Sequence, residues 1–338
     1  MLSSFYNEDV KKVDKNQKFP IFIEGDCFAV LKTFEDNSID CVITSPPYFR
    51  EREKNKHFNL NQSLDSYIEN LLRFASEIKR VLKDDGSFWL NLGDRYAKCS
   101  LQMIPSQVAY RLVEEQGWIL NNDVIWKKTS STPTSYKKRL TNSHEHLFHF
   151  VKNKDFYYNL SALDAKKNAP RVVEGVLKTS SSVSGMNYRK IIESSPLLTE
   201  EEKKAAMVEL RRCFDAVTDG SIKDFRILIR GHNKVFSSNR ADEVEKNGFV
   251  VIKSRYNKPS DVWDIAPEKK SPHYAPFPEE LIEFPIKVSC PPKGIVLDPF
   301  CGSGTTNYVA YKNGKASIGI DIHGDFLEYA KERCGQID

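Results

Sequence analysis

Apolar positions along the chain follow two different periods, and their alternation predicts the class of fold. From Leu64 to Leu82 the apolar residues recur with the i, i+3, i+4, i+7 spacing of one helical face. Short apolar runs at 19–26 and 38–48 end at glycine or proline, which is typical of buried strands. The first part of the chain therefore predicts strands separated by an amphipathic helix.

The same reading extends through most of the chain. Asp84, Asp85 and Gly86 predict a turn after the first long helix. The further expected elements are strands at 87–94, 119–127, 146–151, 294–300 and 317–322, and helices at 104–116, 278–290, 304–314 and 325–334. Strands that alternate with helices indicate βαβ units, so we expect an α/β protein with a mostly parallel sheet covered on both faces.

The regular pattern weakens in the middle of the chain. Residues 152–259 contain a Ser-rich stretch, a charged helix-like stretch at 199–214 and short apolar pieces. We therefore predict that residues 19–151 and 260–338 form the two halves of one domain, and that residues 152–259 form an insertion or second lobe.

The distribution of charge supports this division more than the total does. The 338 residues carry 50 Lys and Arg against 46 Asp and Glu, and 40% are hydrophobic, which excludes disordered, collagen-like and small disulfide-rich proteins. Residues 121–260 hold 26 basic and 16 acidic side chains, which leaves 24 basic and 30 acidic for the two ends. A basic middle suits a polyanion such as nucleic acid, although a solvated basic surface would give the same count.

Cysteine and histidine patterns argue against disulfide and metal chemistry. The seven cysteines form no CxxC pair and are odd in number, so we expect a reducing compartment. The histidines at 144–149 do not form HExxH because position 148 is Phe, so we expect no metal. Neither an apolar leader nor a run of about 18 apolar residues is present, and we expect a cytoplasmic protein without membrane contact.

A glycine-rich motif is the first candidate site. The sequence DPFCGSGTT, Asp298–Thr306, lies between a predicted strand and a predicted helix, and Asp321 closes the next strand. Glycines allow a tight turn and close approach of a ligand, and an acidic residue about 20 positions later can bind ribose hydroxyls. The phosphate-binding pattern GxxxxGK[ST] is missing. The loop thus predicts a nucleoside site, and a plain strand-to-helix turn is the alternative.

A proline motif is the second candidate site. The sequence TSPPY, Thr44–Tyr48, lies at the end of a predicted strand, where open α/β sheets bind ligands. The two prolines fix the backbone and lack the N–H groups that other residues would donate, so the backbone here offers only carbonyl acceptors. A hydroxyl side chain precedes the prolines and an aromatic ring follows them. A simple Pro-Pro turn is the alternative.

Together the motifs resemble the two signatures of the amino-methylating DNA methyltransferases, DPFxGSGTT and [ST/N/D]PP[YF]. These enzymes use S-adenosylmethionine to modify cytosine N4 or adenine N6. The resemblance covers roughly 19–151 and 260–338, and the proline motif comes first by about 250 residues, which is similar to the circularly permuted β arrangement of that family. It implies a Rossmann-like methyltransferase fold with a mixed, mostly parallel sheet, helices on both faces, and target recognition by residues 152–259.

The resemblance also implies roles for individual residues. Ser45 and the Pro46 carbonyl would accept hydrogen bonds from the amine, and Tyr48 would stack on a base flipped out of the duplex. The full catalytic set is Ser45, Pro46, Pro47 and Tyr48. The implied cofactor-binding residues are Asp26, Phe277, Asp298, Pro299, Phe300, Gly302, Ser303, Gly304, Thr305 and Asp321.

DNA phosphates are the expected partners of basic side chains that flank a Ser/Thr-rich loop. These are Lys127, Lys128, Lys137, Lys138 and Arg139. In the middle region Arg226, Arg230, Arg240 and Arg255 are candidates for guanine contacts, and phosphate contact or simple solubility fits each of them as well.

Substrate and context follow from the same resemblance. Ser45 favours cytosine N4, because the family tends to have Asp or Asn at this position in adenine-N6 enzymes; adenine N6 is the alternative. Cytosine C5 is excluded because no Pro-Cys pair occurs. A catalytically inactive DNA- or nucleoside-binding relative is a further alternative. The expected setting is double-stranded DNA in a bacterial or phage restriction-modification system, near the nucleoid, with a cognate endonuclease as functional partner and the enzyme as monomer or homodimer.

Overall fold

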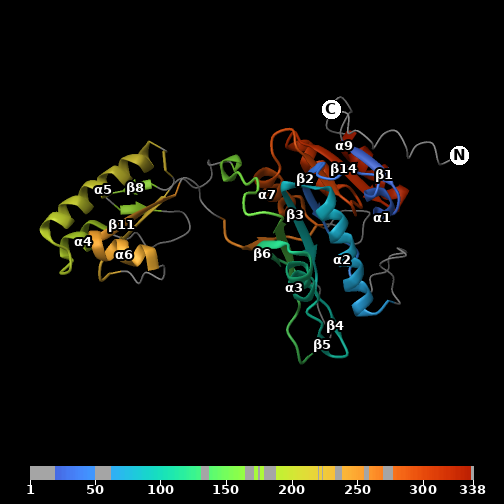
Figure 1. Cartoon of the computed structure of the whole chain (residues 1–338), viewed down its shortest axis with the longest axis horizontal. Helices are drawn as coiled ribbons and strands as arrows, with labels where there is room; N and C mark the ends of the chain where they lie inside the picture. The colour runs from blue at the N-terminus through green and yellow to red at the C-terminus, as the bar shows by residue number, and fades with distance from the viewer. Residues whose placement is uncertain are drawn as a thin grey trace. The chain divides into compact units, whose positions relative to one another are not determined.

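The computed structural model divides the chain into two compact units (Figure 1). Residues 1–159 and 260–338 form the main unit, and residues 160–259 form the inserted unit. The structure describes residues 20–49, 62–130, 137–163, 171–173, 176–178, 188–219, 221–222, 224–232, 238–254, 259–268 and 277–335. In the structure the inserted unit begins at Leu160, whereas the sequence pattern predicted that it begins at residue 152.

The main unit alternates strands and helices. Its elements before the insertion are β1 (Ile21–Glu24), α1 (Cys27–Leu31), β2 (Ile39–Thr44), α2 (Leu64–Val81), β3 (Leu82–Leu92), β4 (Tyr96–Ala97), β5 (Ser100–Leu101), α3 (Ile104–Gln116), β6 (Ile119–Lys128) and β7 (His144–Val151). Those after it are β12 (Val262–Ile265), α7 (Glu279–Ser289), β13 (Ile295–Asp298), α8 (Thr305–Lys312), β14 (Ala316–Asp321) and α9 (Gly324–Gly335). None of the helices within the described ranges is long and apolar enough to cross a membrane.

An eight-stranded mixed sheet forms the centre of the main unit. Its strand order is β1-β14-β13-β2-β3-β7-β6-β12. Within this sheet, β7 runs antiparallel to its two neighbours, and the other neighbouring pairs are parallel. The α/β fold class with a mixed, mostly parallel sheet is thereby confirmed. Because β13 pairs with β2, the two sequence motifs follow adjacent parallel strands and lie at the same edge of the sheet.

Helices cover both faces of the sheet, as alternate residues of the strands show. Val42 and Phe88 belong to the core that β2 and β3 share with α1, α2 and α3. Cys41 and Trp89 point to the other face, where both contact the hydroxyl of Ser289 in α7. Helices α7, α8 and α9 pack against one another there, and Figure 1 shows α2 and α7 on opposite sides of β2 and β3.

Helix α2 forms where its sequence predicts it. Ser63 caps the first turn by accepting a hydrogen bond from the backbone of Ser66, and basic residues occupy the last turn. The apolar stripe is buried along its length, with Leu71 and Ile78 1% exposed or less. Periodicity, capping and burial therefore agree along the whole helix.

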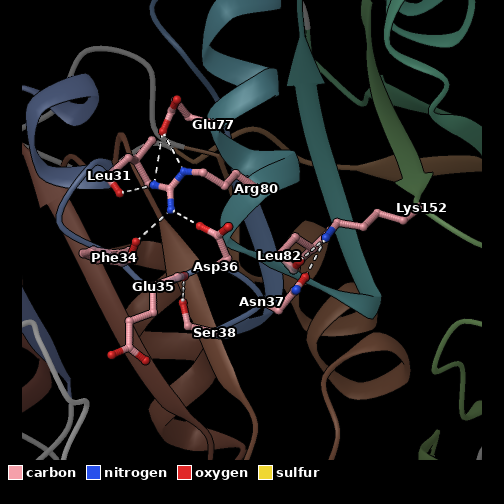
Figure 2. Close-up of polar contacts among 10 residues, drawn as sticks. All are labelled: Leu31, Phe34, Glu35, Asp36, Asn37, Ser38, Glu77, Arg80, Leu82 and Lys152. Carbon is pink, nitrogen blue, oxygen red and sulfur yellow. Dashed lines mark hydrogen bonds and ion pairs between the residues drawn. The ribbon is translucent and has the colours of Figure 1, made fainter.

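Arg80 at the end of α2 holds the loop between α1 and β2 (Figure 2). Its guanidinium donates hydrogen bonds to the carbonyl oxygens of Leu31 and Phe34 at 2.7 and 2.8 Å. It also forms an ion pair of 2.6 Å with Asp36. These contacts fix the start of β2, the strand that ends at Thr44.

The prediction of a turn at residues 84–86 was wrong. Strand β3 continues through these residues, and its register against β2 shifts between the pairs Ile39–Leu82 and Cys41–Ser87. The extra residues form a bulge, and a Cβ atom at Gly86 would lie only 2.9 Å from the carbonyl oxygen of Asp40. In the sequence, a glycine that allows close backbone approach within a bulge gives the same signal as a glycine in a turn.

The inserted unit has its own core. Its elements are η1 (Leu160–Ala162), β8 (Arg171–Val173), β9 (Val176–Lys178), α4 (Tyr188–Ser194), α5 (Glu200–Thr218), β10 (Asp224–Ile229), α6 (Ser238–Asn247) and β11 (Phe249–Ser254). Thr199 and Glu202 form a reciprocal capping box at the start of α5. Buried side chains of α4, α5 and β10, such as Ile192, Leu210 and Phe225, form one cluster, and partly buried side chains of the antiparallel partner strand β11 pack against it.

Candidate active site

The two sequence motifs are joined by a buried carboxylate. Asp298, the last residue of β13, accepts hydrogen bonds of 2.6 Å from the hydroxyls of Thr44 and Thr306, and one of 3.1 Å from the backbone of Phe300. Burial raises the pKa of Asp298 to about 6, although the three donors lower it in part. The end of β2, the end of β13 and the start of α8 are therefore held together at one point.

The glycine loop folds back on the end of β14. Gly302 and Gly304 have φ values of 47° and 74°, in the left-handed region that favours glycine. At Gly304 a Cβ atom would also lie 2.6 Å from the Cβ of Ala330. The backbone N–H of Gly302 donates to the Asp321 carboxylate at 2.9 Å. The loop thus brings its own backbone beside an acidic side chain at the carboxyl edge of the sheet.

Asp321 and its surroundings fit a nucleoside. Each carboxylate oxygen of Asp321 accepts one backbone N–H, from Gly302 and from His323. A carboxylate has about four acceptor positions, so capacity for two ribose hydroxyls remains on this half-buried side chain. Beside it, the Nε2 atom of His323 is buried and has no hydrogen-bond partner among the described residues.

Other residues expected to hold a cofactor have structural contacts. Asp26 caps α1 by accepting a hydrogen bond from the backbone of Ala29, and the neighbouring Gly25 donates its N–H to the Asp321 carbonyl. The Phe300 ring lies 5.1 Å from that of Phe74 in α2.

Thr305 accepts a hydrogen bond of 3.1 Å from Arg333 in α9. Three more of the expected residues, Phe277, Pro299 and Ser303, are buried. The segment 269–276, which precedes Phe277, lies outside the described residues.

The proline motif forms a rigid turn directly after β2. Pro46 and Pro47 are buried, whereas Ser45 and Tyr48 are half-buried. The hydroxyl of Tyr67 in α2 donates a hydrogen bond of 3.0 Å to the carbonyl of Pro47. The turn is therefore anchored by α2 and leaves its Ser45 and Tyr48 side chains partly accessible.

A chain of hydrogen bonds leads from Ser45 to a buried carboxylate. The Ser45 hydroxyl donates to the Tyr48 hydroxyl at 3.2 Å, and the Tyr48 hydroxyl lies 2.7 Å from Oε2 of Glu145. Oδ1 of Asn91 lies 3.0 Å from the same hydroxyl, and Lys128 forms an ion pair with Glu145. The position of the Tyr48 ring is thus set by residues of β3, β6 and β7.

Sequence reasoning missed Glu145 and Asn91. A usable signal was present for Glu145, because it is an acidic residue in an otherwise apolar strand, and a buried carboxylate needs partners. Gly93 also belongs to the site, since a Cβ atom there would lie 2.8 Å from Cε2 of Tyr48. Phe49, in contrast, packs into the core with its ring 5.5 Å from that of Tyr67, which leaves Tyr48 as the accessible aromatic ring of the turn.

The basic residues near the loop after β6 have different surroundings. Lys127 forms an exposed ion pair of 2.6 Å with Asp264, whereas Lys128 points to Glu145 inside the site. Lys137 and Lys138 are at least partly exposed, and the Arg139 guanidinium lies 4.1 Å from the centre of the Tyr96 ring.

The inserted unit contains an arginine with a structural role. Arg230 donates to the carbonyl of Leu197 and pairs with Glu202. Arg226 and Arg240 are exposed, and Arg255 lies outside the described residues. On α4 and α5, Arg189, Arg211 and Arg212 line an open pocket of about 530 Å³ with Met207 and Phe214.

Over the residues that the structure describes, no group of three or more His, Cys, Asp or Glu side chains could hold a metal ion. His144 and His146 lie on the same strand with their rings 5.5 Å apart, and His146 contacts Asp123 at 2.9 Å. The turn after β2 offers the hydroxyls of Ser45 and Tyr48, backbone carbonyls and an aromatic ring, and the carboxylate of Glu145 lies behind them.

Comparisons with known proteins agree with this arrangement. A family model described as DNA methylase matches residues 39–332. The chain is 26% identical to the Type II methyltransferase M.SfiI of Streptomyces fimbriatus, over 91% of this chain and 89% of that protein. It is 25% identical to the Type II methyltransferase M.Cfr9I of Citrobacter freundii, over 92% and 86%.

Solved structures share the fold. The chain superposes on the PvuII DNA methyltransferase (cytosine-N4-specific) with a TM-score of 0.59 and 19% identity, over 92% of this chain and 85% of that one. A putative DNA modification methylase of Thermus thermophilus, solved in complex with S-adenosyl-L-methionine, gives a TM-score of 0.53 and 19% identity, over 94% of each chain. The Rossmann-like arrangement of the main unit is common to these structures.

Proposed function

The chain belongs to the DNA methylase family that modifies N6 and N4 amines, and we propose that it methylates the exocyclic N4 amine of a cytosine flipped out of double-stranded DNA. Its cofactor is S-adenosylmethionine, which supplies the methyl group on a positively charged sulfur. The observation that carries the proposal is the hydrogen bond between Thr44 and Asp298. This contact joins the turn after β2 to the glycine loop.

Residues of the glycine loop and of β14 would hold the cofactor. The Asp321 carboxylate has acceptor capacity for ribose hydroxyls, and Gly302 and Gly304 allow the backbone to approach closely. His323 offers a buried nitrogen without a partner among the described residues. Asp298 would hold the glycine loop in place rather than contact the cofactor itself, because it is fully buried and its oxygens already accept three hydrogen bonds.

The Ser45 side chain is suited to activate an amine. Its proton is directed to the Tyr48 hydroxyl, so the lone pairs of its oxygen are available to accept an N–H from the substrate. With the Pro46 carbonyl as second acceptor, two hydrogen bonds would localise the amine lone pair and aim it for in-line transfer. No covalent intermediate with the protein is required.

The methylated amine must then lose a proton, and a path for it leads from Ser45 to Glu145. Ser45 Oγ would take the proton while its own proton passes to the Tyr48 hydroxyl, whose proton passes to Glu145. Each step joins groups within hydrogen-bond distance, as proton transfer requires. The path ends at a carboxylate in the strand β7.

Base flipping is part of the proposal because an exocyclic amine inside a duplex cannot reach the cofactor. Unstacking costs a few kcal/mol, and stacking on an aromatic ring returns about 1–3 kcal/mol per base. Tyr48 is the accessible ring of the turn, and its hydroxyl is anchored to Glu145. An anchored ring loses little freedom when the base stacks on it.

Cytosine is favoured over adenine by the residue at position 45. The resemblance associates Ser at this position with cytosine-N4 enzymes, and the PvuII enzyme is cytosine-N4-specific by its name. Adenine N6 remains the second candidate, because its amine also stands beside a ring nitrogen and would make the same two hydrogen bonds.

The inserted unit, residues 160–259, is assigned to target recognition. Residues 160–259 hold 19 basic and 13 acidic side chains, and a basic surplus favours binding to phosphates. The names of M.SfiI and M.Cfr9I as Type II methyltransferases support a role in a restriction-modification system. A cognate endonuclease would then be the functional partner.

Incubation with tritiated S-adenosylmethionine and mixed-sequence duplex DNA, followed by digestion to nucleosides, tests the proposal. We expect the label in N4-methylcytosine. Label in N6-methyladenine would show that the substrate base is adenine rather than cytosine. The absence of label from DNA under conditions where the cofactor binds would contradict the enzyme assignment. Heat-denatured protein serves as the control.

A further inference from the structure

A basic rim with exposed apolar side chains borders the catalytic turn. We define the rim as residues 95–103, which contain the β4–β5 hairpin, and residues 137–142, which lead into β7. Its sequence holds five basic side chains and no acidic one. The five are Arg95, Lys98, Lys137, Lys138 and Arg139.

The two segments of the rim are held together by specific contacts. The Arg139 guanidinium covers the Tyr96 ring at 4.1 Å, and the side-chain amide of Asn142 donates to the carbonyl of Asp94 at 3.2 Å. Figure 1 shows the hairpin and the segment before β7 extending from the same end of the sheet. The rim is therefore one surface, built from parts about 40 residues apart along the chain.

The hairpin itself is well defined. Lys98 and Cys99 both have left-handed φ values, 49° and 64°, as a tight two-residue hairpin turn requires. The side chain of Gln102 donates to the carbonyls of Ala97 and Ser100. The hairpin thus presents a fixed surface.

A direct contact couples the rim to the catalytic turn. The Arg95 guanidinium donates a hydrogen bond of 2.9 Å to the carbonyl of Phe49, and Phe49 follows Tyr48 in the sequence. Asp94 fixes the two ends of the hairpin by accepting from the backbones of Arg95 and Ile104. The rim consequently lies next to the position where a flipped base would stack.

Apolar side chains on this rim are unusually exposed. Leu140 is 89% exposed, and Met103 and Leu101 are 55% and 42% exposed. Leu140 follows Arg139, which covers Tyr96, and Tyr96 pairs with Leu101 across the hairpin. Isolated exposed leucines are common on proteins. Apolar residues surrounded by basic ones, beside a site that must open a duplex, have the composition of a DNA wedge.

We propose that the rim binds the DNA backbone around the target and that Leu140 enters the base stack where the target base leaves it. The proposal rests on the proposed function and deepens it. The basic side chains would neutralise phosphates on both sides of the opening, and Leu140 would fill the vacated space, as apolar wedges do in proteins that kink or open DNA. Stacking on Tyr48 and insertion of Leu140 would then favour the same open state.

The test compares two duplexes that contain the sequence at which the wild-type enzyme methylates plasmid DNA. In one the target base is paired, and in the other it faces an abasic position, so that it leaves the stack at little cost. We expect Leu140→Ala to lower kcat/KM at least tenfold on the paired duplex and less than twofold on the abasic duplex. Leu140→Met, which keeps a side chain of similar volume, should restore most of the loss.

Tyr329→Ala is the matched control, since it removes an exposed apolar side chain from α9 and should change neither rate. Equal losses on the two duplexes would show that Leu140 makes an ordinary contact, and no loss on either would show that it makes none; both results overturn the wedge. If the wild-type protein methylates neither plasmid nor duplex DNA, the proposed function itself fails, and this outcome is distinct from the other two.

Discussion

The hydroxyl of Thr44 donates a hydrogen bond of 2.6 Å to the carboxylate of Asp298, across 254 positions of sequence. Both side chains are fully buried. The residue that precedes Ser45 is thus attached to the first residue of the glycine motif. This contact makes one site from two motifs that the sequence shows only as separate patterns.

Replacement of Thr44 tests this attachment. Thr44→Val removes the donor and leaves a buried carboxylate with one hydrogen bond fewer, which should lower the free energy of unfolding by about 2 kcal/mol and weaken cofactor binding. Thr44→Ser keeps the hydroxyl and should retain both. Urea denaturation at pH 7 and titration calorimetry with S-adenosylmethionine give the two quantities. Wild-type stability and affinity in Thr44→Val would contradict the role of this contact.

The contact between Tyr48 and Glu145 predicts energetic coupling. Tyr48→Phe and Glu145→Gln should each lower kcat about tenfold, because each removes one member of the proton path, whereas cofactor affinity should stay unchanged. If the two groups act together, the double variant should be hardly slower than either single one. Multiplied losses in the double variant would mean that the two residues act independently. Tyr329→Phe, on the surface of α9, is the control for loss of a tyrosine hydroxyl.

His149 predicts how stability depends on pH. Burial lowers the pKa of His149 to about 3, and the ring is stacked on Trp89 at 4.1 Å. In the unfolded chain the imidazole titrates near pH 6.5. Between about pH 6.5 and 3 the unfolded state therefore binds one proton more, and the free energy of unfolding should fall by up to about 1.4 kcal/mol per pH unit as the pH is lowered.

A variant separates this effect from other titrating groups. His149→Gln removes the imidazole and should show a smaller fall in the free energy of unfolding between about pH 6.5 and 5, even if it is less stable at pH 7. Urea denaturation of both proteins at several pH values measures the difference. Parallel curves for the two proteins would show that His149 does not cause the dependence.

Arg80 predicts a purely structural effect. Arg80→Ala removes the hydrogen bonds to two carbonyls and the ion pair with Asp36 shown in Figure 2. Since the side chain is 29% exposed, we expect a loss of about 1–2 kcal/mol in the free energy of unfolding. Cofactor affinity per folded molecule should stay within twofold. Arg80→Lys should recover part of the stability, and an unchanged urea midpoint in Arg80→Ala would refute the prediction.

Much of the main unit could be predicted because each signal was local. The apolar stripe of α2 and the short apolar runs that form β2 and β13 depend on neighbours in sequence. The bulge at Gly86 could not be read, because it depends on the register against β2, a contact between distant segments. The hairpin β4–β5 was missed because two-residue strands have no measurable period.

The candidate site also contains residues that the sequence could predict and residues that it could not. Ser45, Tyr48, Asp298 and Asp321 belong to motifs and could be named from the sequence. The contacts that position Tyr48 could not be read from the sequence, because Asn91, Lys128 and Glu145 come from three other strands. Glu145 nevertheless gave a usable signal as an acidic residue in an apolar strand. Phe300 also belongs to the glycine motif, which implies a cofactor contact, and its ring packs against Phe74 in α2.

The transfer rate of Ser45→Ala tests the central claim most directly. Single-turnover methyl transfer to duplex DNA should fall about 100-fold or more, as when one hydrogen bond of a catalytic site is lost. The affinity for S-adenosylmethionine, measured on the same sample by calorimetry, should stay within twofold. A wild-type transfer rate in Ser45→Ala would contradict the assignment of the amine-binding site to the turn between β2 and Tyr48.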